Sequence, residues 1–178
     1  MPICPPRDPD RTRVTRIYIA AGSSIEPEER MRRAAQALRQ RFAGIRFSPC
    51  YRNQAFGFEG PDFINAVAGL DSGLEPGELI AQLEAIEALC GRGRADPKWA
   101  PRAMDLDLLL YGDLIRSTER YRVPRPDLLH RIYMLQPLAA LAPELIHPET
   151  GLSIAAHCEA LQRTEPALVP LALDLNAE

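Results

Sequence analysis

The sequence predicts an α+β fold: a ferredoxin-like βαββαβ core, in which an antiparallel sheet is flanked by helices, followed by a C-terminal helical extension. Strand-like apolar segments occur at residues 16–21, 45–51, 63–68 and 104–111. Segments with helical hydrophobic spacing follow the first and the third of them. This order is that of the split βαβ folds. At 178 residues with 46% hydrophobic content, the chain is long enough for one packed core.

The first half of the core begins with a β-rich segment, residues 16–21, which ends at Gly22. Apolar residues then recur at helical intervals at Met31, Ala34, Ala35, Leu38 and Phe42. The second strand, around residues 45–51, contains Pro49 and should be irregular there, because proline cannot donate to a β-ladder. A loop rich in glycine, phenylalanine and proline follows at residues 53–62.

The second half of the core contains the third strand, residues 63–68, and a helix that Pro76 opens and Gly91 ends. Residues 104–111 read as a buried strand, after which a turn leads to a short partner at 114–115. From about residue 127 the chain has helical, proline-punctuated patterns. We expect a disordered tail at 1–15, a single domain at 16–164 and a C-terminal tail at 165–178.

Charge and composition exclude several classes of function. Lys and Arg number 21 and Asp and Glu 24, so the net charge of −3 does not indicate a nucleic-acid or membrane surface. Lys98 is the only lysine, which removes the Walker A phosphate loop. The four cysteines and three histidines lack zinc-ligand spacing. With no signal-peptide pattern, the sequence favours a cytoplasmic protein with reduced thiols.

The strongest chemical signal is Asp105-Leu106-Asp107 inside the apolar strand. Alternation sends both carboxylates to one face, with Cα atoms about 6.5 Å apart. Oxygen ligands held this close suit Mg²⁺. Two solvated acids on an exposed face would give the same pattern, so the motif alone leaves both interpretations open.

The preceding segment, residues 91–102, carries four cations and one acid, and so concentrates positive charge in an acidic chain. Arginine forks match phosphate oxygens, so the segment beside the two aspartates suits a polyphosphate. A solvated basic loop is the alternative, and Trp99 argues against it. Further arginines follow at Arg116, Arg120, Arg122, Arg125 and Arg131.

A flat heterocyclic ligand would need other side chains. Phe56, Phe58, Phe63 and Tyr133 could stack on a ring, although most aromatic residues are simply core. Asn65 is more informative, because an amide among apolar strand residues offers both donors and an acceptor.

At this point several segments together resemble the 6-hydroxymethyl-7,8-dihydropterin pyrophosphokinases of folate biosynthesis. The segments are residues 18–23, 48–52, 61–66, Glu87 with 91–94, 99–107, 123–131, 135–138 and 142–144. The Pro-Arg-x-x-Asp-x-Asp segment at 101–107 is the most specific of them.

The resemblance implies transfer of pyrophosphate from Mg-ATP to the pterin hydroxymethyl group, with release of AMP. Two Mg²⁺ ions would be held by Asp105 and Asp107, and Arg92 and Arg102 would be catalytic at the phosphates. The implied ATP-binding residues are Glu87, Arg92, Arg94, Lys98, Trp99, Arg102, Arg120, Arg125 and Arg131. The implied pterin-binding residues are Asn53, Gln54, Phe56, Phe63, Asn65 and Tyr133. We expect a monomer that binds ATP and pterin but neither nucleic acid nor membrane.

The chain departs from the family's usual pattern at a few positions. Ser24 stands where asparagine is usual, Arg125 replaces a histidine, Lys98 replaces an arginine, and Asn53-Gln54 replaces part of a Thr-Pro-Pro segment. Two alternatives therefore stay open: a non-catalytic relative that binds pterin or nucleotide, and another Asp-x-Asp metal-dependent nucleotidyl transferase.

Overall fold

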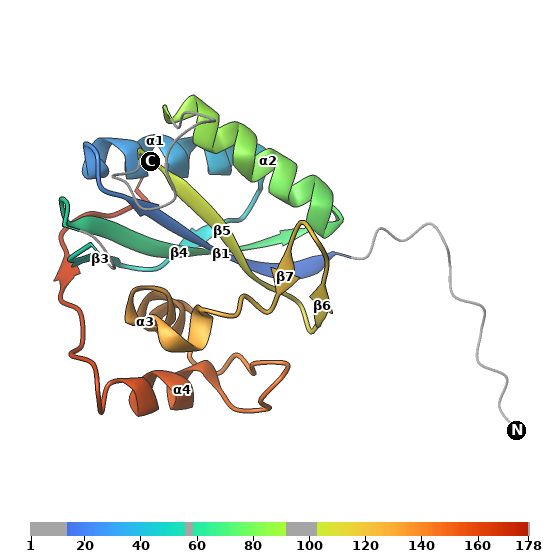
Figure 1. Cartoon of the computed structure of the whole chain (residues 1–178). Helices are drawn as coiled ribbons and strands as arrows, with labels where there is room; N and C mark the ends of the chain where they lie inside the picture. The colour runs from blue at the N-terminus through green and yellow to red at the C-terminus, as the bar shows by residue number, and fades with distance from the viewer. Residues whose placement is uncertain (1–13, 56–58, 92–102, 178) are drawn as a thin grey trace, which may run out of the picture.

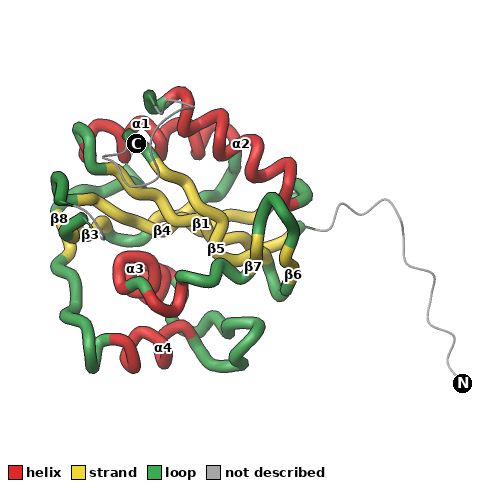
Figure 2. The backbone as a smooth tube through the Cα atoms, in the orientation of Figure 1, coloured by secondary structure: helices red, strands yellow, loops and turns green. Residues whose placement is uncertain are grey.

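The computed structural model describes residues 14–55, 59–91 and 103–177 and consists of an antiparallel sheet between two helical layers (Figures 1 and 2). The main path of the sheet runs in the order β5-β1-β4-β3-β8, and β2 also pairs with β4. Its strands are β1 Thr15–Ser23, β2 Arg46–Phe47, β3 Cys50–Asn53, β4 Phe63–Ser72, β5 Asp105–Tyr111 and β8 Pro170–Leu171. This order confirms the predicted ferredoxin-like fold.

Helices α1 (Pro27–Arg41) and α2 (Pro76–Leu89) cover one face of the sheet (Figure 1). Met31, Ala34, Ala35 and Leu38 are the buried residues of α1, as their helical spacing predicts. They pack on alternate residues of β1 and β4, such as Ile19. Proline occupies the first turn of both helices, where its missing N–H costs nothing.

The C-terminal extension consists of the 3₁₀ turn η1 (Leu128–His130), α3 (Ile132–Leu141) and α4 (Ile154–Leu161). Helix α3 covers the opposite face of the sheet, and α4 packs on the far side of α3 (Figure 1). Leu135 and Leu138 of α3 pack on Tyr18, Ala20 and Val67 of the sheet. Both faces of the central strands are therefore buried, which explains why β1 and β4 read as continuous apolar runs. Within the described part of the chain, no helix has the length and apolar character needed to span a bilayer.

The second predicted strand is interrupted as expected at Ser48-Pro49, which separates β2 from β3. The hydroxyl of Ser48 accepts a hydrogen bond from the backbone N–H of Val67 at 2.9 Å and donates to the carbonyl of Pro49 at 2.8 Å. The serine side chain thus completes the hydrogen bonding of β4 at the break in its neighbour.

The structure differs from the sequence interpretation at two boundaries. The short partner after the Gly112 turn is not at 114–115: β6 (Arg116–Ser117) pairs with β7 (Arg122–Val123) instead of with β5. Within the described residues, 165–177 do not form a separate tail, because β8 pairs with β3 and Leu173 and Leu175 enter the core. Strands β6, β7 and β8 are each two residues long, which is too short to show a hydrophobic period. Their pairings could therefore not be predicted from the sequence. The first thirteen residues of the predicted N-terminal tail lie outside the described residues.

Candidate active site

Four residues on neighbouring strands form one line across the sheet. Gly22 of β1 pairs with Asp105 of β5 on one side and with Asn65 of β4 on the other, and Asn65 in turn pairs with Tyr51 of β3. Directly paired residues share a face of the sheet. This line faces α3, because the next residues of the same alternation, Ala20 and Val67, contact that helix layer.

The two aspartates occupy the α3 face of β5, as alternation predicts. Met104, Leu106 and Leu108 are buried on the opposite, α1–α2 face, and the carboxylates stay partly exposed, Asp107 at 25% of its side-chain surface. Opposite them on β1 stand Gly22 and Ala20, the two smallest residue types.

A β-bulge lies directly after the aspartate pair. Tyr18 pairs with Leu110 and Ile19 with Leu108, so Leu109 is the extra residue of β5. Leu109 and Leu110 both join the core against α3. The bulge therefore ends the strict alternation just beyond Asp107, and no sequence pattern indicated it.

Cationic and phenolic side chains gather around Asp107. Arg125 Nη1 donates to Asp107 Oδ1 at 3.0 Å, and the backbone N–H of Arg125 donates to the carbonyl of Leu109 at 2.9 Å. Burial raises the pKa of the Tyr133 phenol, on which the charges of Arg131, Asp127, Arg125 and Asp107 also act. The structure thus brings Arg125 to the carboxylate end of the line, with Arg131 and Tyr133, at the start of α3, within electrostatic range of it.

Amide groups occupy the other end. Asn65 is 8% exposed, and its Nδ2 donates to Oδ1 of Asn53. The Nδ2 of Asn53 donates to the carbonyl of Gln54 at 2.8 Å. A Cβ on Gly22 would lie 2.7 Å from Asn65 Oδ1 and 3.9 Å from Phe63 Cδ1, so the amide and the aromatic ring both adjoin this glycine. Gly22 is a site residue that sequence reasoning did not single out.

Glu87, predicted to bind ATP, is placed differently. It is 6% exposed, and its Oε1 accepts a hydrogen bond from the backbone N–H of Leu106 at 2.7 Å. Its carboxylate therefore holds the backbone between the two aspartates from the α2 side of the sheet. Arg120 also lies toward α2, in an exposed pair with Glu84 at 3.3 Å.

The predicted residues Phe56, Arg92, Arg94, Lys98, Trp99 and Arg102 lie outside the described residues. On each side of 92–102, a described residue accepts a hydrogen bond from a side chain elsewhere in the fold. Arg30 Nη1 donates to the carbonyl of Cys90 at 2.7 Å, and the hydroxyl of Ser23 donates to the carbonyl of Ala103 at 2.6 Å. These two contacts were not predicted, because arginine and serine are ordinary at such positions and the bonds span 60 and 80 residues.

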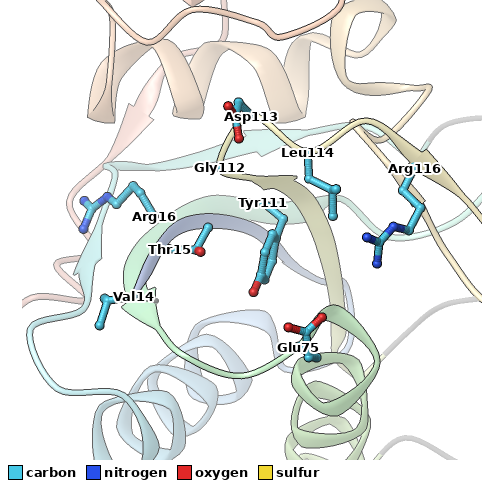
Figure 3. Close-up of a pocket in the computed structure, with 9 residues that line it drawn as sticks. All are labelled: Val14, Thr15, Arg16, Glu75, Tyr111, Gly112, Asp113, Leu114 and Arg116. Carbon is cyan, nitrogen blue, oxygen red and sulfur yellow. The ribbon is translucent and has the colours of Figure 1, made fainter. Parts of the chain in front are cut away.

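A cavity of about 390 Å³ opens elsewhere, at the opposite ends of β1 and β5 (Figure 3). Thr15, Arg16, Tyr111 and Arg116 are among its lining residues, and none of the predicted site residues that the structure describes lines it. Six residues of strand separate Arg16 from Gly22, a distance of about 20 Å. The cavity is therefore distinct from the Asp105–Asn65 line.

The aspartate pair suits a hard cation shared with a ligand. No cluster of three or more His, Cys, Asp or Glu side chains that could hold a metal occurs among the described residues. Mg²⁺ often takes one or two carboxylates and completes its octahedron with water and phosphate oxygens, and two carboxylates on one strand face fit that requirement.

Comparison with solved structures supports the fold. The chain superposes on the HPPK-DHPS of Plasmodium falciparum bound to pteroate with a TM-score of 0.69 at 10% identity, covering 85% of this chain and 44% of that chain. A second HPPK-DHPS structure, crystallised with its substrates, gives a TM-score of 0.64 at 11% identity and covers 85% and 45% of the two chains. The chain thus spans less than half of these longer proteins.

Comparison of sequences defines the family. Residues 18–143 match the family described as 7,8-dihydro-6-hydroxymethylpterin-pyrophosphokinase (HPPK). The 2-amino-4-hydroxy-6-hydroxymethyldihydropteridine pyrophosphokinase of Pseudomonas aeruginosa is 40% identical over 141 residues, which are 76% of this chain and 86% of the relative. The enzyme of the same name from Synechocystis sp. is also 40% identical, over 137 residues, covering 75% and 69%. The chain belongs to the HPPK family, and the predicted resemblance is confirmed.

Proposed function

We propose that this chain transfers a pyrophosphate group from ATP to the hydroxymethyl group of 6-hydroxymethyl-7,8-dihydropterin, releasing AMP. Family membership over residues 18–143 supports the reaction class and ATP as co-substrate. The line from Asp105 to Asn65 supports the assignment to this face of the sheet, because carboxylates stand at one end and amides at the other.

At the carboxylate end, Asp105 and Asp107 are the proposed ligands of Mg²⁺, with two ions expected when ATP is bound. Bound Mg²⁺ would neutralise phosphate charge and orient the chain of phosphates. Arg125 and Arg131 would contribute positive charge beside it. Arg92 and Arg102 are proposed at the transferring phosphates by resemblance.

At the amide end, Asn65 and Asn53 would read the hydrogen-bonding edge of the pterin, with Gln54 and Phe56 completing this side by resemblance. Phe63, beside Gly22, and Tyr133 of α3 are proposed to stack on the ring faces. A flat, polar heterocycle needs this combination of amide and aromatic contacts.

The proposed chemistry is a direct displacement. The pterin hydroxymethyl oxygen attacks the β-phosphorus of ATP, the bond from that phosphorus to the α,β-bridging oxygen breaks, and AMP leaves. The hydroxyl proton is lost to solvent or to a phosphate oxygen. Catalysis rests on positioning and on neutralising charge. The described cysteines are buried, and burial raises the pKa of Cys50 to about 12, so they are not proposed as nucleophiles.

The single observation that carries the proposal is the pairing of Gly22 with Asp105 and Asn65 at once, which sets the two kinds of binding group on one face. Product analysis by phosphorus NMR, with Mg-ATP and the pterin supplied together and separately, tests it. We expect AMP and a pterin diphosphate only when both are present. Release of pyrophosphate would support another nucleotidyl transferase instead, and binding without turnover would support a non-catalytic relative.

The proposal also includes a monomer in the cytoplasm that binds neither nucleic acid nor membrane. Size-exclusion chromatography with light scattering tests the first of these statements: a mass near 19.8 kDa supports a monomer, and twice that mass would overturn it.

A further inference from the structure

The last part of the chain, residues 165–177, forms an extended segment that we call the C-terminal strap. It leaves α4, passes the edge of the sheet at β3 and ends near α1 (Figure 1). The strap lies outside residues 18–143, the part that matches the family. Its role therefore has to be argued from this chain's own contacts.

Two side-chain amides clamp the strap, each by bonding both backbone groups of one residue. Gln136 of α3 donates to the carbonyl of Leu168 at 2.8 Å and accepts from its N–H at 2.7 Å. Asn176 of the strap accepts from the N–H of Phe47 at 2.9 Å and donates to its carbonyl at 3.0 Å. Each amide replaces one rung of a β-ladder at a place where no strand continues.

The two clamps differ in what else they touch. Phe47 belongs to the core beneath α1, on the face away from the proposed site. The amide of Gln136 also acts on the buried Tyr51 of β3, where it opposes the rise in the tyrosine's pKa that burial causes, and α3 contacts β3. Gln136 thus joins three elements: α3, the strap and β3.

Two of those elements, β3 and α3, lead to residues of the proposed pterin side, and the strap is paired with β3. Tyr51 pairs directly with Asn65, and Asn53, two residues further along β3, accepts the hydrogen bond from Asn65. Tyr133 is one helical turn before Gln136 on α3 and lies on the same side of the helix. Leu168 precedes β8, whose Leu171 and Pro170 pair with Cys50 and Tyr51 of β3.

We propose that Gln136 is a positioning residue for pterin binding, which fixes α3 against the β8–β3 edge of the sheet and thereby sets the distance between Tyr133 on α3 and Asn53 on β3. This proposal rests on the proposed function. The strap takes part because its Leu168 backbone holds the Gln136 amide next to β8, which pairs with β3. The Asn176 clamp has no such connection and only fastens the end of the strap.

The two clamps supply matched variants. Gln136→Met keeps the length of the side chain and loses its hydrogen bonds, and Asn176→Leu does the same at the other clamp. Gln136→Glu retains an acceptor for the Leu168 N–H and serves as the partial rescue. For each protein we would measure the dissociation constants for the pterin and, separately, for a non-hydrolysable ATP analogue by calorimetry, together with the thermal midpoint.

We expect Gln136→Met to weaken pterin binding by about tenfold, which corresponds to one or two hydrogen bonds, while ATP-analogue binding stays within twofold. Gln136→Glu should lie between wild type and Gln136→Met. Asn176→Leu should lower the thermal midpoint about as much as Gln136→Met does. It should leave pterin binding within twofold of wild type.

Equal pterin affinities for Gln136→Met and Asn176→Leu would overturn the positioning role, and so would equal losses of pterin and ATP-analogue binding in Gln136→Met. If Gln136→Met does not fold, Gln136→Glu carries the same comparison. Failure of the wild-type chain to bind the pterin would overturn the proposed function itself and is seen before any variant is compared.

Discussion

Arg125 Nη1 donates to Asp107 Oδ1 at 3.0 Å, so one oxygen of the proposed metal-binding pair is already taken by a cation. The guanidinium is 31% exposed, and its Nε is buried with no hydrogen-bond partner among the described residues. Arg125 stands where histidine is usual in the resembling family. Metal and arginine therefore compete for Asp107, and phosphate oxygens offer the displaced guanidinium a new acceptor.

Arg125→Gln should consequently separate metal binding from nucleotide binding. Without nucleotide, Mn²⁺ should bind a few-fold more tightly, because the competing cation is gone, whereas ATP should bind roughly tenfold more weakly because a phosphate partner is lost. Electron paramagnetic resonance and calorimetry measure the two affinities. Arg16→Gln, at the exposed pair with Asp71 at the far end of β1, is the control. Unchanged affinities for both ligands in Arg125→Gln would contradict the competition.

Gly22→Ala tests whether Asn65, whose side chain adjoins Gly22, binds the pterin. The new Cβ would lie 2.7 Å from Asn65 Oδ1, the far end of a side chain that can move aside, so we expect little loss of stability but displacement of the amide. Pterin affinity should fall at least tenfold. Gly77→Ala, with nothing within 4 Å of the new Cβ, should leave binding unchanged and stabilise the chain slightly. Pterin affinities that match in the two variants would show that Asn65 does not bind the pterin.

Glu87 has a structural role that can be separated from ATP binding. Glu87→Ala leaves the buried N–H of Leu106 without its acceptor, which should cost about 1–3 kcal/mol. Glu84→Ala, an exposed position on the same helix, should cost under about 0.5 kcal/mol. Urea denaturation gives both values. A cost for Glu87→Ala as small as that for Glu84→Ala would mean that the Leu106 bond contributes nothing to stability.

A pair of histidines, His147 before α4 and His157 within it, predicts acid sensitivity of the fold. His147 and His157 have ring centroids 5.8 Å apart. Burial and the neighbouring His157 lower the pKa of His147, against the opposing charge of Glu149, and burial lowers the pKa of His157. As the pH falls below the ordinary value of 6.5, the unfolded state binds protons more readily than the folded state. Stability should therefore decrease from about pH 6.5 downward.

The thermal midpoint measured between pH 7.5 and 5 checks this dependence. Between pH 7.5 and 5, the thermal midpoint of His147→Gln should fall less than that of wild type. The midpoint of His130→Gln, a change at an exposed position, should fall as much as that of wild type. Parallel pH profiles for His147→Gln and wild type would refute the assignment to this pair.

The parts of the fold that could be predicted are those with enough residues to show a period. The α1 face, the alternation around Asp105 and Asp107, and the isolated amide Asn65 were all visible in the sequence and confirmed in position by the structure. Their roles toward metal and pterin stay predictions.

The parts that could not be predicted depend on contacts between distant residues. Leu109 becomes a bulge because of how β1 and β5 pair, and β6, β7 and β8 are two residues long. The strap is held by amide side chains 32 and 129 residues from their partners, and glutamine and asparagine at such positions carry no local signal. The importance of Gly22 could not be predicted, because it depends on the close approach of the Asn65 side chain from the neighbouring strand.

The central claim, that the Asp105–Asp107 face is the metal–nucleotide site, is tested most directly by the rate of pterin-dependent AMP formation in Asp105→Asn and Asp107→Asn. We predict a loss on the order of a thousandfold or more for each variant, with thermal midpoints near that of wild type. Asp113→Asn, at the distant cavity, should keep its rate within twofold. Rates within tenfold of wild type for both aspartate variants would contradict the claim.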